Sequence, residues 1–217
     1  SAPAAGRVFL NEAVRSQFHF PEQVPFILRD MGADAAFFAQ RGVTAKRYDL
    51  VYAGAISTRP GLLDCLIRLA NGGFRIGLAG TMTDSELARI TACPGIEHVG
   101  KLAANEVPAF VSQSRFGLNY CPDIYPYNIQ TSTKAIEYLA AGIGIVSNRY
   151  AWIDAHAERF GYRYLDVDQL RSPDDLVDVP QAVLPEDVAR QFEWERLLDD
   201  AGFERFIMRC VTHSTGP

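Results

Sequence analysis

Short apolar segments alternate with amphipathic segments along residues 49–148, and this alternation limits the possible folds more than any other feature. Residues 49–56 form a β-prone run, and residues 62–70 then show the apolar spacing of a helix. The same order recurs, with strands expected at 74–79, 96–99, 116–120 and 144–148 and helices at 84–91, 105–113 and 131–142. Because strands that alternate with helices build parallel sheets, we predict an α/β fold with a mainly parallel sheet.

The two ends of the sequence carry weaker patterns. Near the start, residues 12–17 are expected to form a helical turn with Asn11 as its N-cap. Short strands are expected on either side of this turn, at 8–10 and 24–28. After Tyr150 the expected elements are a short helix, a strand near 161–165, a polar loop at 172–180 and a helix, in one or two pieces, over 186–208.

Composition and charge exclude several classes of protein. Of the 217 residues, 48% are hydrophobic and 22% are charged, which is typical of globular proteins and not of disordered chains. The net charge of -5 argues against a broad nucleic-acid-binding surface. Because no signal peptide and no CxxC pair is found, we expect a cytoplasmic protein. Four cysteines are expected to be reduced and mostly buried: Cys65, Cys93, Cys121 and Cys210.

Several common catalytic and metal-binding signatures are missing from the sequence. It contains no GxxxxGK[ST], GxSxG or HExxH motif and no EF-hand loop. The segment Gly142-Ile143-Gly144 runs from a helix into a strand, whereas a dinucleotide fingerprint runs from a strand into a helix. The four histidines are scattered, so we expect them to be structural and predict no metal site.

Residues 130–142 carry the strongest indication of chemistry. Thr131, Ser132 and Thr133 crowd the start of the expected helix together with Lys134. Free backbone N-H groups and the helix dipole favour an anion there, typically a phosphate. Glu137 lies one turn further on the same helix face, where its carboxylate could accept hydrogen bonds from the hydroxyl groups of a sugar. The alternative is a capped amphipathic helix with a surface ion pair.

Loops that follow the other expected strands should meet this helix start. Ligands of open α/β sheets bind beyond the carboxyl ends of the strands. Three loops converge there: 54–61, which contains Arg59, 80–83, and 100–105, which contains Lys101. Each loop alone is more consistent with an ordinary turn than with a binding loop. Together with Lys134, the two cations describe a crevice that suits a diphosphate.

Four stretches of the sequence match the motifs of a known family. The most specific is STKAIEYLAAGIGIVSN at 132–148, which resembles the pattern K-x-x-E-Y-x-A-x-G-x-P-(I/V)-V. The others are VYAGAISTRPG at 51–61, IEHVGKLAANEVPAFVSQSRFGLNYCP at 96–122 and FEWERLL at 192–198. With residues 8–18 and 24–38, these stretches resemble the carboxy-terminal, nucleotide-sugar-binding half of a GT-B glycosyltransferase of the retaining, family 4-like group.

The resemblance implies a Rossmann-like three-layer sandwich and a division of the chain. Residues 1–40 would be the end of an amino-terminal domain and the crossing between domains, and residues 41–217 the donor-nucleotide-binding domain. Glu137 would bind the ribose, Lys134 a phosphate, and Lys101 would lie near the base. The implied nucleotide-sugar site comprises Gly54, Arg59, Lys101, Leu102, Asn128, Gln130, Thr131, Ser132, Thr133, Lys134 and Glu137.

The sequence also departs from the family's motifs. The two basic positions of the first loop are Ala55 and Pro60, so that Arg59 would have to replace them. The glutamate that meets the donor sugar in the family falls at Ile129, and Asn128 or Gln130 is expected to take its role. In addition, Gly144 replaces a proline.

The function that the resemblance implies is a metal-independent, cofactor-independent glycosyltransferase that uses a nucleotide-diphosphate sugar. The acceptor would be a carbohydrate or a lipid-linked molecule, and no catalytic residue can be named. We expect a fragment that lacks an amino-terminal domain, present in cis or as a separate chain, and no nucleic-acid partner. The alternatives are a non-catalytic nucleotide-sugar-binding or scaffold module and a nucleotide-sugar epimerase.

Overall fold

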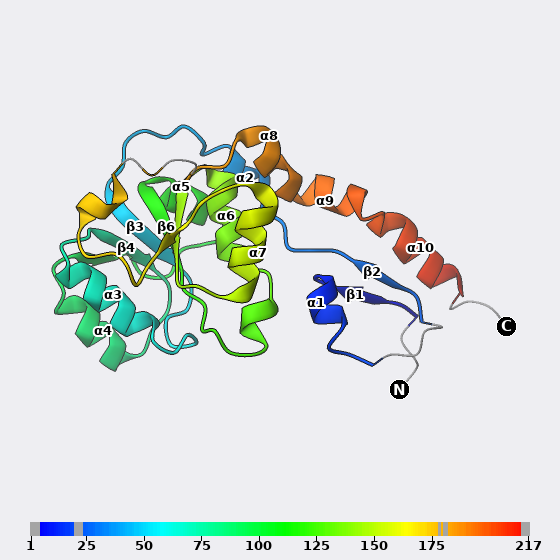
Figure 1. Ribbon diagram of the computed structural model, residues 1–217, viewed down its shortest axis with the longest axis horizontal. Helices are drawn as coiled ribbons and strands as arrows, with labels where there is room; N and C mark the ends of the chain where they lie inside the picture. Colours follow the sequence, from blue (N-terminus) through cyan, green and yellow to red (C-terminus); the bar gives the residue numbers. More distant parts are fainter. Residues whose placement is uncertain (1–4, 20–23, 178, 180–181, 214–217) are drawn as a thin grey trace.

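A six-stranded parallel sheet forms the centre of the larger part of the molecule, at the left of Figure 1. The computed structural model describes residues 5–19, 24–177, 179 and 182–213. The strand order is β5-β4-β3-β6-β7-β8, and every neighbouring pair is parallel. The strands are β3 (Tyr48–Ala53), β4 (Ile76–Ala79), β5 (Ile96–His98), β6 (Ser114–Asn119), β7 (Gly144–Ser147) and β8 (Leu165–Asp166). The predicted mainly parallel sheet is therefore confirmed.

Helices cover both faces of this sheet, which gives three layers. One face carries α3 (Leu62–Asn71) and α4 (Asp84–Thr91), and the other carries α2 (Ala35–Phe38), α5 (Val107–Ser112), α6 (Thr133–Ala141) and α7 (Ala151–Phe160). Successive side chains of a strand point to opposite faces. In β3, accordingly, Val51 belongs to the apolar cluster under α6, whereas Leu50 and Tyr52 belong to the cluster under α3.

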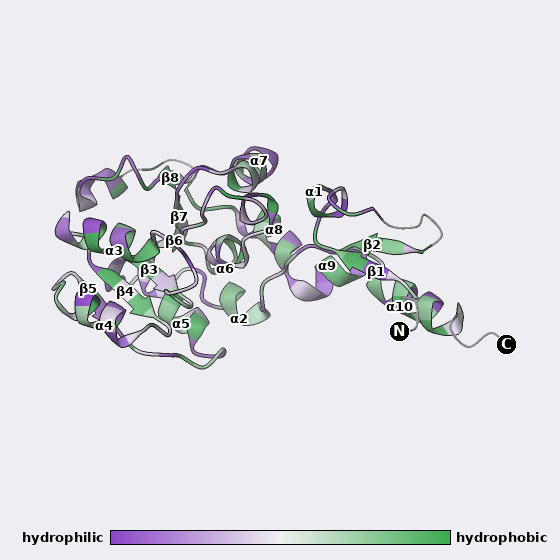
Figure 2. Cartoon of the chain, turned by 90° about the horizontal axis from the view of Figure 1, so that it is seen from below, coloured by the Kyte–Doolittle hydropathy of each residue, from purple (hydrophilic) through white to green (hydrophobic). Residues whose placement is uncertain are grey.

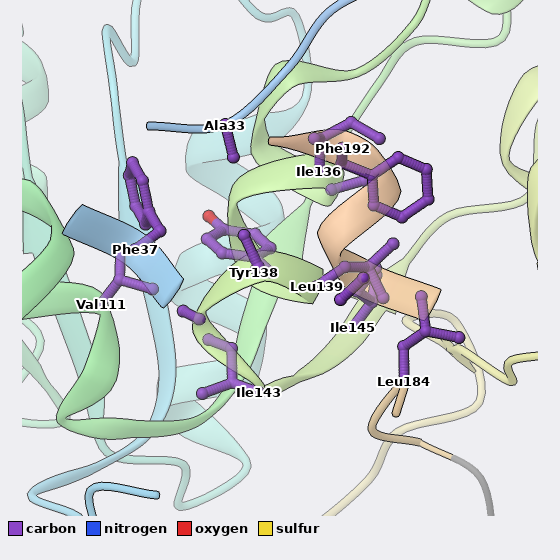
Figure 3. Close-up of a cluster of buried hydrophobic side chains, with 14 of the residues drawn as sticks. Ala33, Phe37, Val111, Ile136, Tyr138, Leu139, Ile143, Ile145, Leu184 and Phe192 are labelled. Carbon is purple, nitrogen blue, oxygen red and sulfur yellow. The ribbon is translucent and has the colours of Figure 1, made fainter. Parts of the chain in front are cut away.

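Helix α6 lies in the middle of the larger apolar cluster. Figure 3 shows Tyr138 at its centre, with Phe37 and Val111 on one side and Ile136 and Phe192 on the other. The ring of Tyr138 occupies the space that a side chain at position 117 would fill, because a Cβ atom on Gly117 would lie 2.3 Å from that ring. The Tyr138 hydroxyl donates a hydrogen bond to the Leu118 carbonyl at 3.3 Å. These contacts set how α6 sits on β6.

A second, smaller sheet lies beside the main one. It consists of β1 (Arg7–Phe9) and β2 (Phe26–Leu28), which pair in parallel and are connected through α1 (Glu12–Arg15). The end of the chain returns to this sheet through α8 (Glu186–Ala189), α9 (Trp194–Asp200) and α10 (Phe203–His213) (Figure 1). A Cβ atom on Gly6 would lie 2.5 Å from the Cys210 sulfur, so α10 packs directly against the start of β1.

Most of the predicted elements are confirmed, with small shifts at their ends. The helix predicted at 84–91 has these bounds, and the helix predicted at 131–142 begins at Thr133 with Ser132 as its N-cap. The helix predicted over 186–208 is broken into α8, a 3-10 turn at Arg190–Phe192, α9 and α10. Glu193 adopts an extended backbone (φ -67°, ψ 134°), and Gly202 has φ +64°, so the helix cannot run through either residue.

The weaker elements differ more from the prediction. The strand expected near 161–165 is reduced to β8, and the polar loop expected at 172–180 contains a 3-10 turn at Pro173–Leu176. Residues 178 and 180 of that loop lie outside the described residues. Among the residues that the structure describes, no helix is long and apolar enough to cross a membrane.

The side-chain chemistry of His156 and of the buried cysteines agrees with the structural roles expected for them. Cys65, Cys93 and Cys121 are buried. His156 is buried on α7, where its ring stacks on Trp152 at 4.5 Å between centroids. Burial lowers the pKa of His156 to about 3, so the ring stays neutral at physiological pH.

We expect Gly117→Ala to destabilise the fold by about 1–3 kcal/mol, because the added methyl group overpacks the contact with the Tyr138 ring. Urea-induced unfolding measures this change. The double variant Gly117→Ala/Tyr138→Leu should lose less stability than the sum of the two single variants, since the two sites share one contact. A Gly117→Ala chain as stable as the wild type would contradict the tight packing of α6 on β6.

Candidate functional site

Two adjoining pockets lie at the edge of the main sheet where its strands end. The loop pocket, of about 350 Å³, is lined by Ala53, Gly54, Ala55, Ala79, Gly80, Thr81, Lys101, Leu102, Val107, Thr133, Lys134 and Glu137. The helix-start pocket, of about 270 Å³, is lined by Leu10, Met31, Arg59, Asn119, Tyr120, Cys121, Tyr127, Gln130, Thr131, Ser132, Thr133 and Lys134. Thr133 and Lys134 border both pockets, so the start of α6 separates and connects them.

Two glycines allow the loops of the loop pocket to come close together. Gly54 follows β3 with φ +151°, and Gly80 follows β4 with φ +145°, which are conformations that other residues rarely adopt. A Cβ atom on Gly80 would lie 1.9 Å from the Gly54 carbonyl oxygen. A Cβ atom on Gly54 would lie 2.9 Å from the Lys134 ammonium nitrogen. The missing side chains therefore create the space in which Lys134 meets both loops.

Hydroxyl groups hold the start of α6 in place. Ser132 caps the helix by accepting a hydrogen bond from the Ala135 N-H at 3.4 Å, and its own hydroxyl donates to the Asn119 side chain at 2.6 Å. Asn119 also donates to the Tyr150 hydroxyl at 3.0 Å. Since the first N-H groups of a helix have no partner within it, this fixed start presents donors and a positive dipole end to the pockets.

Lys134 and Glu137 are the charged side chains of α6 that reach the loop pocket. The Lys134 ammonium lies 5.0 Å from the centroid of the Tyr52 ring. Burial lowers the pKa of Lys134, and the nearby Glu137 carboxylate partly opposes this change. Burial raises the pKa of Glu137 to about 7, with Lys134 opposing it. No hydrogen bond from a described residue contributes to either shift, so both groups keep their hydrogen-bonding capacity for a ligand.

Arg59 brings a further positive charge to the helix-start pocket. It follows β3 in the sequence, and its guanidinium carbon lies 5.3 Å from the centroid of the Tyr127 ring. Tyr127 belongs to a 3-10 turn at Tyr127–Ile129 and lines the same pocket. With Lys134, Arg59 makes this pocket positively charged, as an anionic ligand requires.

The structure brings most of the predicted site residues together. Gly54, Lys101, Leu102 and Glu137 line the loop pocket, and Arg59, Gln130, Thr131 and Ser132 line the helix-start pocket. Asn128 does not line either pocket. Its side-chain amide donates to Asp123 at 3.1 Å instead, because the 3-10 turn directs it toward the preceding loop. Asn128 and Gln130 were the two residues expected to replace the family's glutamate, and of these only Gln130 lines one of the two pockets.

Sequence reasoning missed the pocket residues contributed by the amino-terminal segment. Leu10 follows β1 and Met31 follows β2, and both line the helix-start pocket. They are apolar residues remote in sequence from α6, so no local pattern indicates them. Asn119 was also missed, although a polar residue at the carboxyl end of a buried parallel strand is a recognisable signal.

The described residues contain no group of three or more His, Cys, Asp or Glu side chains that could hold a metal ion. The ligand chemistry of the two pockets rests instead on cations, hydroxyl groups and one carboxylate. Such a set of groups suits a polyhydroxylated anion.

Comparison with known proteins identifies the fold. No protein-family model and no curated protein sequence matches the chain. Among solved structures, it is similar to AviGT4, a glycosyltransferase involved in avilamycin A biosynthesis, with a TM-score of 0.67 and 16% identity over 94% of this chain and 64% of that one. Sucrose-phosphate synthase from Thermosynechococcus elongatus gives a TM-score of 0.60 and 16% identity over 93% of this chain and 58% of that one.

A third similar structure is Anabaena HepE in complex with UDP and glucose, with a TM-score of 0.60 and 13% identity over 92% of this chain and 62% of that one. At these identities the similarity shows the fold alone. The chain has the Rossmann-like α/β fold of these GT-B glycosyltransferases, as its sequence motifs predicted. It spans between 58% and 64% of the length of the three structures.

We expect the stability of the fold to depend on pH through Glu137. Its pKa rises from 4.5 to about 7 on folding, so between these values the folded state binds more protons and the free energy of unfolding falls as pH rises. Glu137→Gln removes this penalty. Relative to the wild type, the variant should gain about 2 kcal/mol more at pH 8 than at pH 5.

Urea-induced unfolding at the two pH values measures the effect. Glu195→Gln is the matched control, because Glu195 is exposed on α9. The control should change stability equally at both pH values. If Glu137→Gln also changed the free energy of unfolding equally at pH 5 and pH 8, this would contradict a buried, destabilised carboxylate at the loop pocket.

Proposed function

We propose that this chain is the donor-binding part of a retaining glycosyltransferase that uses a nucleotide-diphosphate sugar. The observation that carries the proposal is the start of α6, where Lys134 and Glu137 enter one pocket whose other wall is made by two glycine loops. This arrangement joins an anion site to a hydroxyl acceptor within one helical turn. The fold shared with glycosyltransferases supports the same conclusion.

The proposed pose follows from the chemistry of the pocket walls. The diphosphate lies against the start of α6, where Ser132, Thr133 and Lys134 provide donors and Arg59 provides a second cation. The ribose hydroxyls donate to the Glu137 carboxylate. The base lies in the loop pocket near Lys101, Leu102 and Val107. The UDP and glucose bound to HepE, which has the same fold, support UDP as the first nucleotide to test.

In the proposed reaction, the protein stabilises the leaving group. The bond between the anomeric carbon of the sugar and the diphosphate breaks, and negative charge grows on the diphosphate. Lys134, Arg59 and the dipole of α6 would stabilise that charge, because they are held in place before the reaction begins. The sugar carbon forms its new bond to a hydroxyl oxygen of a carbohydrate or lipid-linked acceptor, and the proton of that hydroxyl passes to the leaving diphosphate or to solvent. Retention of configuration is taken from the sequence resemblance.

An amino-terminal domain, in the same chain or as a separate one, completes the proposed enzyme. The small sheet supports this, because β1 and β2 form a parallel pair. Parallel sheets normally have more than two strands, and other elements normally cover both of their faces. Figure 2 shows hydrophobic residues on β1, β2 and α10. The large apolar residues exposed there include Val8, Phe26, Leu28, Ile207, Met208 and Val211. Residues 1–40 would then belong to the end of that domain and to the crossing.

A non-catalytic nucleotide-sugar-binding module is the second candidate. It is favoured by Ala55, Pro60 and Ile129, which replace three functional positions of the family. Ile129 does not line the loop pocket or the helix-start pocket. The epimerase alternative has less support, because Glu137 is the single carboxylate among the described residues that line these two pockets.

We expect one nucleoside diphosphate from a panel of UDP, GDP, ADP and dTDP to raise the melting temperature of the chain, because binding to the native state stabilises it. Calorimetric titration then gives the dissociation constant. Lys134→Ala should weaken nucleotide binding about 10-fold or more, because a charge-assisted contact is lost. Glu137→Gln should weaken the binding of the nucleotide but not the binding of inorganic pyrophosphate.

Arg196→Ala is the matched control, because Arg196 is exposed on α9, away from both pockets. It should bind the nucleotide as tightly as the wild type. Absence of binding by every nucleotide, or equal binding by the wild type and Lys134→Ala, would overturn the proposed donor site.

We expect the 217-residue chain by itself to bind the donor but to transfer or hydrolyse it slowly. A closed cleft that orients both substrates supplies much of the rate of a transfer enzyme, and here one wall of that cleft is the proposed additional domain. Release of the nucleoside diphosphate from the donor sugar measures turnover. Full transfer activity by the purified chain would contradict the need for the additional domain.

A further inference from the structure

Three segments that are remote in sequence meet behind the start of α6. Thr131, which precedes the N-cap, donates a hydrogen bond to the Asp30 carboxylate. The side chain of Asn11 donates to the Thr131 hydroxyl at 3.3 Å and to the Ile129 carbonyl at 3.4 Å. Its oxygen also caps α1 by accepting from the Val14 N-H at 2.9 Å. We call Asn11, Asp30 and Thr131 the Asp30 cluster.

Hydrogen bonds stabilise the charged form of the partly buried Asp30 carboxylate. Burial raises its pKa, whereas the hydrogen bonds from Thr131 and from the Met31 N-H lower it. The Met31 N-H lies 2.8 Å from the carboxylate oxygen. Thr131 is itself buried, so loss of either partner would leave a polar group without compensation. The cluster is therefore held in one geometry rather than loosely packed.

The Asp30 cluster forms a wall between two hollows. Leu10, Met31 and Gln130 line the helix-start pocket. Their sequence neighbours Asn11, Asp30 and Ile129 line a separate hollow of about 260 Å³, bordered by α7. On each of the three segments, adjacent residues thus face opposite hollows. A shift of the cluster must move the wall of the helix-start pocket.

The cluster also adjoins the groups of the proposed donor site along the chain. Thr131 is followed directly by Ser132, the N-cap of α6, and then by Thr133 and Lys134, which border both pockets. Asn119 holds Ser132 from the sheet, and Asp30 holds Thr131 from the amino-terminal segment. The start of α6 is therefore fixed from two sides, one of which lies outside the main sheet.

We propose that Asn11, Asp30 and Thr131 are positioning residues, through which the amino-terminal segment sets the place of Thr131–Lys134 and hence the affinity of the donor site. The effect on affinity rests on the proposed function. The effect on the start of α6 does not, because it follows from the hydrogen bonds alone. No residue of the cluster needs to touch the nucleotide's reacting atoms.

Two pairs of variants test the role of the cluster. Thr131→Val keeps the shape of the side chain and removes its hydroxyl, whereas Thr131→Ser keeps the hydroxyl. Asp30→Asn removes the charge that accepts from Thr131. Asp154→Asn is its control, because Asp154 on α7 also accepts a hydrogen bond from a hydroxyl, that of Tyr164, away from both pockets.

The first measurement is hydrogen exchange, in the chain without ligand, of the Ala135 and Ile136 backbone amides, which donate to the Ser132 hydroxyl and to the Ser132 carbonyl. We expect exchange to accelerate at least 10-fold in Thr131→Val and Asp30→Asn, and less than 3-fold in Thr131→Ser and Asp154→Asn. Amides of β3 in the main sheet should keep their wild-type rates, which separates a local change from general destabilisation. Unchanged exchange at Ala135 and Ile136, or equal acceleration in Thr131→Ser, would overturn the proposal.

The second measurement is the dissociation constant of the nucleoside diphosphate that binds the wild type. We expect this constant to rise about 10-fold in Thr131→Val and in Asp30→Asn. The double variant should have a dissociation constant no higher than that of the single variant that binds more weakly, because both substitutions remove the same hydrogen bond. Retention of wild-type affinity in both single variants would overturn the link to the donor site. If the wild type binds no nucleotide, the proposed function fails, and the exchange measurement still decides the positioning role.

Discussion

The packing of α6 on β6 is the contact on which the rest of the structure depends. The Tyr138 ring fills the space above Gly117, and its hydroxyl bonds to the backbone of the same strand. Because this contact is tight, α6 has one rotation about its axis relative to the sheet. That rotation turns Lys134 and Glu137 toward the loops after β3 and β4. A feature of the apolar core thus decides which polar groups meet in the pocket.

The charged groups at this site are held at a cost to the fold. Lys134 and Glu137 are largely withdrawn from water and have no hydrogen bonds from the described residues. Burial lowers the pKa of Lys134 and raises that of Glu137, and both shifts favour the neutral forms. Burial of incompletely paired charge is unfavourable, and proteins retain it mainly where a ligand supplies the missing partners. A polyhydroxylated anion would supply both, since its phosphates pair with Lys134 and its hydroxyls with Glu137. The expected pH dependence of stability and the proposed affinity for a nucleotide would be two aspects of the same arrangement.

The small sheet and the main sheet are connected through polar contacts as well as through the chain. The Asp30 cluster joins the segments after β1 and β2 to the residues before α6. At the other end of the chain, the Arg29 guanidinium lies 5.0 Å from the Trp194 ring centroid, so α9 is held against the segment that follows β2. Movement of the small sheet would therefore shift the start of α6. In the proposed two-domain enzyme, such contacts would link the position of the amino-terminal segment to donor binding.

The sequence by itself determined the local elements and the fold class. Thr83 and Glu86 form a capping box at α4, and Ser132 and Gly142 bound α6, because caps act within one or two turns. Tertiary structure alone decided which distant residues meet. It joined Asp30 to Thr131 across 101 positions, chose Gln130 over Asn128 for the pocket, and broke the helix predicted over 186–208. Propensity and periodicity depend on neighbours in sequence, whereas these outcomes depend on how whole elements pack.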